Sequence, residues 1–381
     1  NKYLGYNTME LINKEIWREK MTAKERWIAS LKLEPVDKLA FWPKISGSYL
    51  NYQGGSFKSM TVEQMHDYIG SDKHQWLVGF IKEKRRTTSF EEIKQGMTRK
   101  LVYSTKYGNL TATMRFDEPS QAWHPVEYPV KARQDIEIMT EWFADACFEI
   151  DEEKLQEAKQ MYKETGSDAI TAHSIGTTPL MQWVQHLAGI ENCHYFLSDF
   201  TEEVERLFET MQKKNRKSAE ILAQDSPAEI LYLVENTSTT LISPQQYRKY
   251  CYKDILDCAG IVNDSGKFLV LHMCGHLKNL LVDLARLPVS GFEAFTTMPV
   301  GNTTLVEARK ICPDKCLIGG TNAVLWTKSA EEIINEIEEE LYKLPHHRGL
   351  VITSAGVMPP VCKPETIRQV CQWVQQYRIR V

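Results

Sequence analysis

The second half of the chain repeats one pattern, in which a short apolar run is followed by a segment with helical periodicity. Runs such as 230–234 (ILYLV) are apolar throughout, which is typical of strands buried on both faces of a parallel sheet. Helix starts are marked between the runs. Ser243-Pro244 is a cap residue followed by a first-turn proline, and Thr304 and Ser329 each precede a glutamate by three residues. The pattern therefore predicts strand–helix alternation.

Counting these runs predicts how the sheet closes. Seven strands are expected near residues 40, 170, 232, 270, 293, 318 and 351. Residues 61–82 read as a helix, and an eighth strand is expected between 75 and 150. Eight parallel strands would form a (β/α)8 barrel of the TIM type, and the fold class is predicted as α/β on that basis. A doubly wound open sheet is the alternative, but no glycine-rich phosphate fingerprint supports it.

Two regions do not follow the repeat. Residues 8–33 have helical spacing and are expected to form accessory N-terminal helices. Residues 99–103 and 110–116 alternate as the two strands of a hairpin, within an inserted region that extends over 99–131. We expect one barrel domain over 1–381, with the hairpin as an accessory flap.

Composition excludes several classes of function. The chain has 381 residues, 43% of them hydrophobic and 25% charged, with a formal net charge of −4, as in ordinary soluble domains. Basic and acidic residues are interleaved, so no basic stripe indicates nucleic-acid binding, and no apolar run is long enough to span a membrane. The polar N-terminus is unlike a signal peptide, and nine scattered cysteines predict a reducing, cytoplasmic location.

The chemically most informative stretch is KFLVLHMCGHL, residues 267–277. If a buried strand ends at His272, alternation places Val270, His272 and Cys274 on one face. An imidazole nitrogen and a thiolate sulfur two residues apart are suitable zinc ligands. The alternative is a core strand that ends in an inert histidine and a buried cysteine.

Barrels of this type carry their working groups at the carboxyl ends of the strands, so other strand ends supply further candidates. Glu235 ends an apolar strand, where an unpaired carboxylate would be costly to bury. It is either the third metal ligand beside His272 and Cys274, or a partner in an ion pair or helix cap. Cys362 is a less favoured third ligand. Substrate-binding candidates near strand ends are Trp42, Tyr49, His173 and Glu293. No catalytic residue is expected beyond the metal site.

Four segments carry a resemblance to a known family. They are DKLAFWPKISGSYL (37–50), YGNLTATMRF with WHPVEYPVK (within 107–131), LHMCGH (271–276) and SAGVMPPVCKPETI (354–367). The chain resembles the uroporphyrinogen decarboxylase superfamily. Within it, the chain is most similar to the zinc-dependent corrinoid methyltransferases of the O-demethylase and methylcobalamin:coenzyme M types.

The resemblance implies a zinc enzyme that moves a methyl group between a small substrate and the cobalamin of a corrinoid protein. The loop after the first strand lacks the arginines with which the decarboxylases hold substrate carboxylates. Val357 or a neighbour stands where the coenzyme M enzymes have a second cysteine, which favours Glu235 as a ligand and an O-methyl ether, such as a methoxyarene, as the donor. No Asp-x-His-x-x-Gly motif is present, so the corrinoid would arrive on a separate protein. A methylcobalamin:thiol methyltransferase and a decarboxylase remain as alternatives.

Overall fold

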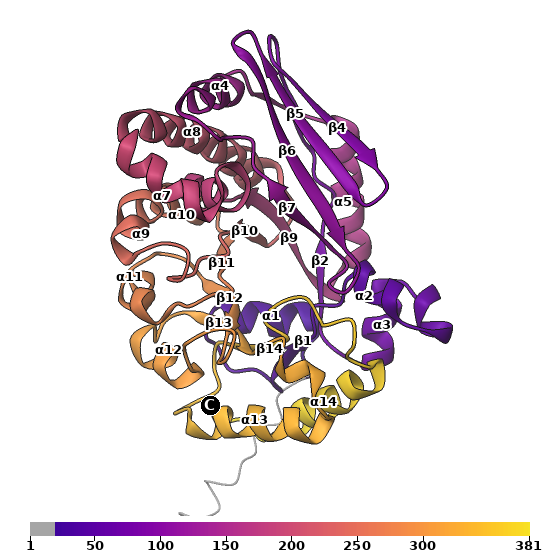
Figure 1. The fold of residues 1–381 in the computed structure, drawn as a ribbon. Helices are drawn as coiled ribbons and strands as arrows, with labels where there is room; N and C mark the ends of the chain where they lie inside the picture. The colour runs from indigo at the N-terminus through magenta and orange to yellow at the C-terminus, as the bar shows by residue number, and fades with distance from the viewer. Residues whose placement is uncertain (1–19) are drawn as a thin grey trace, which may run out of the picture.

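The computed structural model describes residues 20–381 and contains one eight-stranded parallel sheet (Figure 1). Its hydrogen-bonded order is β1-β14-β13-β12-β11-β10-β9-β2, so neighbours along the chain are mostly neighbours in space. The strands are β1 Ala40–Trp42, β2 Lys73–Trp76, β9 Ala169–Gly176, β10 Ile230–Val234, β11 Phe268–His272, β12 Gly291–Thr296, β13 Cys316–Thr321 and β14 Leu350–Thr353. This arrangement confirms the predicted (β/α)8 barrel.

The first and last strands of this order are joined by a side chain. Asp72, next to the start of β2, donates its N–H to the carbonyl of Phe41 in β1 at 2.9 Å. Its carboxylate accepts the N–H of Phe41 at 3.0 Å and also pairs with buried Arg26. Arg26 pairs in turn with Asp37 at 2.7 Å. A buried carboxylate needs such partners, and here they bring the two edges of the barrel together.

Helices form an outer layer around the strands (Figure 1). They are α1 Ala23–Leu31, α2 Gly47–Tyr52, α3 Val62–Ile69, α4 Arg133–Ala144, α5 Glu152–Thr165, α6 Pro179–Gln182, α7 Gly189–Asp199, α8 Thr201–Asp225, α9 Pro244–Tyr250, α10 Tyr252–Asp264, α11 Leu281–Ala285, α12 Leu305–Ile311, α13 Ala330–Lys343 and α14 Pro364–Gln376. Thr304 and Ser329 form capping boxes at the starts of α12 and α13, as their spacing predicts, and Ser243, predicted as a cap before Pro244, forms one at the start of α9.

The barrel interior is a packed apolar cluster separate from the layer between strands and helices. Its buried members are Trp27, Leu31, Ala40, Trp42, Ile170, Ala172, Ile230, Tyr232, Val270, Cys316, Ile318 and Val351. Trp27 and Leu31 come from α1, which packs against β1, β9 and β14. Burying each large apolar side chain contributes about 1.5–3 kcal/mol, so the interior supports the fold as a core rather than as a pore.

The predicted helix over 61–82 is wrong in its second half. Helix α3 ends at Ile69, where Gly70 has a left-handed φ of 81°. Residues 73–76 then form β2, which is the eighth strand and pairs with β9 from Lys73↔Ala169 to Trp76↔Ala172. The sequence KHQW is too short and polar to indicate a strand, and only its pairing partner makes it one.

The inserted region is larger than one hairpin. The predicted strands at 99–103 and 110–116 lie within β5 Thr98–Thr105 and β6 Gly108–Asp117. The outer strands β4 Ser89–Gln95 and β7 Ala122–Glu127 complete a four-stranded antiparallel sheet. Two shorter strands, β3 Ile81–Lys84 and β8 Cys147–Ile150, pair antiparallel with each other. In the sequence, one precedes and the other follows the four-stranded sheet. The sheet packs on α4, where the rings of Tyr103 and Trp142 lie 4.9 Å apart.

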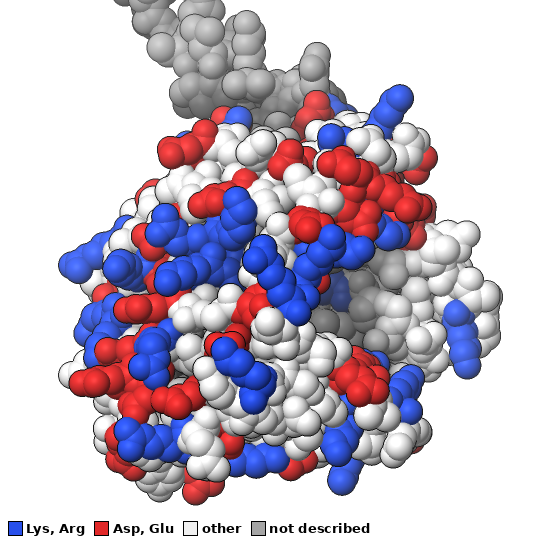
Figure 2. Space-filling view, turned by 90° about the horizontal axis from the view of Figure 1, so that it is seen from above, with Lys and Arg blue, Asp and Glu red and all other residues white. Residues whose placement is uncertain are grey.

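Two further expectations concern the chain ends and the surface. Of the accessory helices expected over 8–33, α1 covers Ala23–Leu31, and residues 8–19 lie outside the described residues. Within residues 20–381, no helix is both long and apolar enough to cross a membrane. On the face shown in Figure 2, basic and acidic side chains are mixed among uncharged ones.

Candidate functional site

A chain of three polar groups lies at the carboxyl end of the barrel. Strands β11 and β12 are paired so that His272 lies opposite Glu293. The Nδ1 atom of His272 hydrogen-bonds Oε2 of the Glu293 carboxylate. The other carboxylate oxygen accepts a hydrogen bond from Nζ of Lys44 at 2.6 Å. Lys44 also donates to the carbonyl of Ala355 at 3.1 Å, so its ammonium group is held between the loops after β1 and β14.

The electrostatics of this chain favour a charged pair. Burial alone would lower the pKa of His272, but the charge of Glu293 and hydrogen bonding with Cys274 raise it to about 9. Burial would raise the pKa of Glu293, but Lys44 and His272 lower it to about 2. Glu293 is therefore ionised at neutral pH, and its two oxygens fix the positions of an ammonium group and an imidazole ring.

Cys274 follows two residues after His272 and faces the loop after β10. Its Sγ lies 3.4 Å from Oδ1 of Asn236. The backbone N–H of Asn236 donates to the carbonyl of His272 at 3.0 Å, so this loop is attached to the end of β11. Gly275 is required here, because a Cβ atom at this position would lie 2.3 Å from Cβ of Ser238. The close approach of the two loops therefore holds Cys274 beside His272.

Glu235 is fully buried and points its carboxylate toward the loop after β9. Its Oε1 accepts the N–H of Thr178 at 2.8 Å, and its Oε2 accepts the hydroxyl of the same residue. Burial raises the pKa of Glu235 to about 7, although both hydrogen bonds oppose this. In the part of the chain that the structure describes, no three His, Cys, Asp or Glu side chains converge as a metal site.

The residues fit zinc in part. His272 and Cys274 supply the nitrogen and sulfur donors that zinc prefers, and the partner of His272 Nδ1 is the carboxylate usual for a metal-binding histidine. The third donor is not in place, because Glu235 is turned onto Thr178. The metal-ligand role of all three residues therefore stays a prediction.

A cavity of about 470 Å³ opens beside the His272–Glu293 pair. It is lined by Trp42, Lys44, Ile45, Ser46, Val62, Glu63, His74, Gln75, Trp76, Tyr232, Val234, His272, Glu293 and Val357. One wall is aromatic: Trp42 stacks on His74 with ring centroids 4.4 Å apart, and Trp76 lies 4.9 Å from Tyr232. The volume and the apolar lining with few polar groups are typical of a small-molecule site.

Three residues with left-handed backbone flank this site. Asn236, Ala294 and Ala355 have φ values of 48°, 59° and 63°. For Ala294 and Ala355 this conformation costs about 1–2 kcal/mol each, whereas asparagine adopts it more readily. Ala294 lies at a register shift between β12 and β13, directly after Glu293, and the Ala355 carbonyl binds Lys44. The strain is therefore located where it orients the Lys44–Glu293–His272 chain.

The structure separates the four predicted substrate-binding residues into two groups. Trp42 and Glu293 line the cavity. Tyr49 is not part of the lining, and its hydroxyl donates to the carbonyl of Cys362 at 2.8 Å. His173 is also elsewhere: its Nδ1 lies 2.7 Å from the Ser226 hydroxyl and its Nε2 lies 2.9 Å from the Val78 carbonyl. Its neighbours Ile170 and Ala172 face the barrel interior, so strand alternation turns His173 outward.

Most of the cavity residues were not proposed as substrate-binding from the sequence, and four of them contribute an ammonium group or an aromatic ring to its walls. These four are Lys44, His74, Trp76 and Tyr232. His74 and Trp76 lie on β2, which was not recognised as a strand, and Tyr232 is the middle residue of an apolar run. A signal was present for Tyr232, because it shares strand parity with Ile230 on the interior face.

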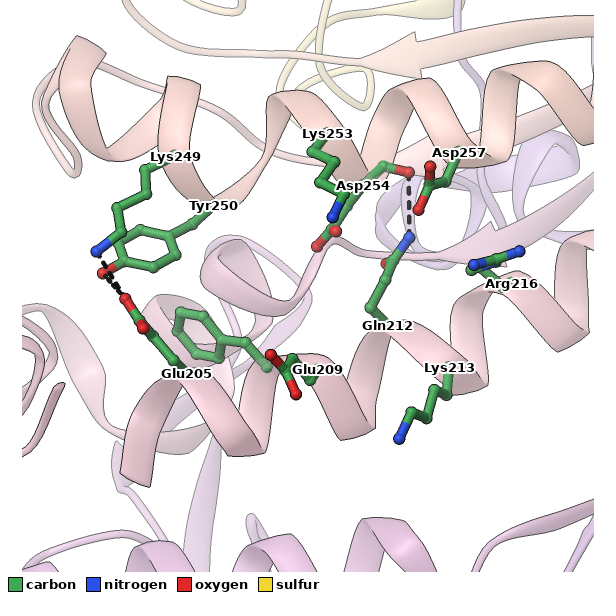
Figure 3. A pocket seen from close by; sticks show the side chains of 11 residues that line it. Glu205, Glu209, Gln212, Lys213, Arg216, Lys249, Tyr250, Lys253, Asp254 and Asp257 are labelled. Atoms are coloured by element: carbon green, nitrogen blue, oxygen red, sulfur yellow. Dashed lines mark hydrogen bonds and ion pairs between the residues drawn. The ribbon is translucent and has the colours of Figure 1, made fainter. Parts of the chain in front are cut away.

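A second cavity, of about 400 Å³, lies between α8 and the α9–α10 segment (Figure 3). Some of its lining side chains are hydrogen-bonded or ion-paired within it. Lys249 lies 2.6 Å from Glu205, and Gln212 donates to the backbone carbonyl of Asp254 at 3.2 Å. It is remote from the strand ends and contains no predicted site residue, so the barrel mouth is the stronger candidate.

The barrel and its polar mouth place the chain in a broad class, in which a (β/α)8 scaffold carries a small-molecule site at the carboxyl ends of its strands. Comparison with family models is more specific. The model described as "Uroporphyrinogen decarboxylase (URO-D)" matches residues 177–377. The chain belongs to the uroporphyrinogen decarboxylase family.

One solved structure supports this fold, and a second was matched over part of the chain. A methyltransferase from Methanosarcina mazei matches with a TM-score of 0.59 and 14% sequence identity, covering 93% of this chain and 98% of that one. A putative vitamin-B12-independent methionine synthase from Listeria monocytogenes matches with a TM-score of 0.36 and 15% identity, over 56% of this chain and 65% of that one. Comparison with curated proteins gives no match.

Proposed function

We propose that this chain is a zinc-dependent methyltransferase that moves a methyl group from a small O-methyl ether, such as a methoxyarene, to the cobalamin of a separate corrinoid protein. The observation that carries the proposal is the Lys44–Glu293–His272 chain at the edge of an aromatic cavity, with Cys274 two residues further on. The Methanosarcina structure with the same fold is named as a methyltransferase, which supports the reaction class.

The ligands we propose are His272, Cys274 and Glu235. Glu293 would hold the Nδ1 proton of His272, so Nε2 would bind a metal after releasing the proton that the charged imidazole carries there. Glu235 would have to release Thr178 to become the third donor. One histidine, one thiolate and one carboxylate together carry two negative charges and so balance the charge of Zn²⁺. Bound zinc would supply a Lewis acid that stabilises negative charge on the oxygen that loses the methyl group.

The remaining cavity residues would bind and orient the methyl donor. Trp42 and Trp76 offer flat surfaces for an aromatic ring, and Val357 from the loop after β14 covers another side. A ring held between them would present its methoxy group to the His272 end of the cavity. A ring bound between these walls would limit contact between water and the reacting atoms, which would strengthen electrostatic stabilisation.

The cavity argues against the decarboxylase alternative. Among its described lining residues Lys44 is the one lysine or arginine, and its ammonium group is engaged by Glu293 and by the Ala355 carbonyl. A substrate with several carboxylates would need free cations at the mouth. The site therefore suits a substrate with little negative charge.

The outer rim of the mouth fits a partner protein. Met298 follows β12, and Val357 and Val361 follow β14, and all three are more than half exposed. Exposed apolar side chains on the loops around a site are candidates for a contact surface. We propose that a corrinoid protein docks over this rim, so that its cobalamin reaches the cavity.

An anaerobic assay tests the proposal. The zinc-loaded chain is mixed with cob(I)alamin and a methoxyarene, and in a parallel reaction with methylcobalamin and a thiol. Methylcobalamin formation from the ether, dependent on zinc, supports the proposal. Transfer to the thiol alone would favour the thiol methyltransferase, and release of carbon dioxide from uroporphyrinogen would favour the decarboxylase.

A further inference from the structure

A single π-helical turn, Trp183–Leu187, follows α6 in the connection after β9. The N–H of Ala188 donates to the carbonyl of Trp183, five residues back, at 2.9 Å. Buried side chains anchor this turn in the core: Trp183, Val184 and Leu187. π-helical turns are rare and often lie at functional sites, and a residue between anchored neighbours has a fixed position. The residue that is fixed in this way is Gln185.

Gln185 connects the π-helical turn to the loop that follows β10. Its Nε2 donates to the backbone carbonyl of Glu235 at 3.2 Å, and its Oε1 accepts a hydrogen bond from Nδ2 of Asn236 at 2.7 Å. The other side of the Asn236 amide faces the mouth of the barrel, where Oδ1 accepts the S–H of Cys274 at 3.4 Å. The side chains of Gln185, Asn236 and Cys274 therefore form one hydrogen-bonded chain that ends at a proposed zinc ligand.

We propose that Gln185 is a positioning residue for the metal site. Through Asn236, it holds the sulfur of Cys274 where that sulfur can bind a metal together with His272. The inference rests on the proposed function, because it concerns one of the proposed ligands. Gln185 would contact neither the metal nor the substrate, and its effect would reach the site through the orientation of the Asn236 amide.

The Asn236 amide needs a partner to hold it. The main chain of Asn236 is already fixed, because its φ is left-handed at 48° and its N–H donates to the carbonyl of His272 at 3.0 Å. The side-chain amide is freer, since the terminal torsion of asparagine is broad and roughly two-fold. The hydrogen bond to Gln185 restricts the amide to orientations in which the two side chains pair. Partners that fix the surroundings of a ligand in this way typically contribute about 10–100-fold to metal affinity.

A pair of amides suits a sulfur atom that changes its hydrogen-bonding role. The free thiol of Cys274 donates its hydrogen to Oδ1 of Asn236. A metal-bound thiolate has no hydrogen and would need the Nδ2 side of the amide as a donor. If Asn236 turns over, Gln185 can turn with it, because each amide group carries both a donor and an acceptor. The hydrogen bond between the two side chains is then kept in both states.

A purely structural role is the alternative, because Gln185 also ties two loops together. A second tie between the same two loops separates the two roles. The hydroxyl of Thr177, after β9, donates to the carbonyl of Val234, at the end of β10, at 2.9 Å. Removing this hydroxyl should loosen the same pair of loops and leave the hydrogen bond between Gln185 and Asn236 in place.

Cobalt(II) titration of the metal-free full chain tests the inference without any methyl transfer. Cobalt(II) accepts the same nitrogen, oxygen and sulfur ligands as zinc, and a cobalt–thiolate bond has a charge-transfer absorption. Loss of this absorption in Cys274→Ala would assign it to Cys274. Gln185→Leu should weaken cobalt binding about ten-fold or more and reduce the absorption per bound cobalt to about half or less.

Two further variants separate the roles. Asn236→Gly should behave like Gln185→Leu, because glycine keeps the left-handed backbone but has no amide. Thr177→Val is the matched control and should change cobalt affinity by less than about three-fold, since the Asn236 amide stays held. If Gln185→Leu does not fold, Gln185→Ala takes its place, with the same expected losses.

Unchanged affinity and absorption in a folded Gln185 variant or in Asn236→Gly would overturn the inference. So would an equal loss in Thr177→Val, which would show that tying the loops is what matters. A wild-type chain without the absorption, or an absorption that Cys274→Ala retains, would overturn both the inference and the ligand role of Cys274. If the cobalt results are as expected but no methyl transfer occurs, the failure counts against the proposed function alone.

Discussion

Glu293 hydrogen-bonds Nδ1 of His272 from the directly paired position of the neighbouring strand. The carboxylate and the imidazole therefore come from two rigid strands rather than from loops. Lys44 binds the second carboxylate oxygen, which prevents the carboxylate from rotating away. This relationship fixes the orientation of the histidine before any ligand is bound, as expected of a preorganised site.

Glu293→Gln tests this relationship. An amide cannot carry the negative charge that holds both Lys44 and the Nδ1 proton of His272. We expect zinc affinity, measured by competition with a chromogenic chelator, to fall about 10–100-fold. Glu63→Gln is the control, because Glu63 also lines the cavity but is exposed. Equal losses in both variants would show that general electrostatics, and not orientation of His272, determine the affinity.

His272→Ala and Cys274→Ala should each remove the metal and leave the fold intact. Both residues lie at the mouth and not in the packed interior, so we expect the thermal midpoint to change by only a few degrees. Elemental analysis should show zinc falling from about one to below about 0.1 per chain. Cys362→Ser changes a buried cysteine that is not part of the cavity lining and should retain zinc. Full metal content in both alanine variants would place the metal elsewhere.

Glu235→Gln separates two roles of one carboxylate. If Glu235 binds zinc, the neutral amide should weaken zinc binding about ten-fold or more and reduce demethylation. Thr178→Val removes the competing hydroxyl donor and should not weaken zinc binding, although losing a buried hydrogen bond should cost about 1–3 kcal/mol of stability. If both variants lose stability but keep zinc affinity, Glu235 only anchors the loop after β9.

Much of the fold was predictable because its signals are local. Continuous apolar runs identified seven strands, and the spacing of Ser243, Thr304 and Ser329 marked helix starts that the structure confirms. Strand β2 was missed because its stability comes from pairing with β9, which lies about a hundred residues away in sequence. Only such non-local pairing makes a short polar segment a strand.

The site was predictable in its residue types more than in its contacts. Parity along β11 placed His272 and Cys274 together, but the register between β11 and β12, which brings Glu293 to His272, cannot be read from either strand alone. The orientation of Glu235 depends on Thr178, which follows a different strand. His173 was expected at the mouth, but it alternates with the interior-facing Ile170 and Ala172, which already indicates that His173 lies on the outer face of the strand.

His66 should make the fold sensitive to acid. Burial lowers the pKa of His66 from 6.5 to about 4, below the value near 6.5 expected in the unfolded chain. The neutral ring therefore stabilises the fold fully above about pH 6.5, and this contribution is lost as the pH falls through about 4. The difference amounts to about 3 kcal/mol, at about 1.4 kcal/mol per pKa unit.

His66→Asn should flatten this pH dependence, since asparagine does not titrate and can keep a hydrogen bond to Ser71. Urea unfolding at pH 7.5, 5.5 and 4.5 measures the free energy of unfolding for both proteins. We expect the wild-type protein to lose more stability than the variant between pH 6.5 and 4. Parallel losses in the two proteins would assign the acid sensitivity to other groups.

The most direct test of the central claim follows the methyl group itself. A methoxyphenol with an isotopically labelled methoxy carbon is incubated anaerobically with cob(I)alamin and the zinc-loaded protein, and methylcobalamin is analysed by mass spectrometry. We predict labelled methylcobalamin with the wild-type protein, and only the protein-free background with the zinc-free protein or with His272→Ala. Two results would contradict a zinc-dependent methyl transfer at this site. One is that the zinc-loaded wild-type protein forms no more labelled methylcobalamin than the protein-free reaction. The other is that His272→Ala forms as much as the wild-type protein.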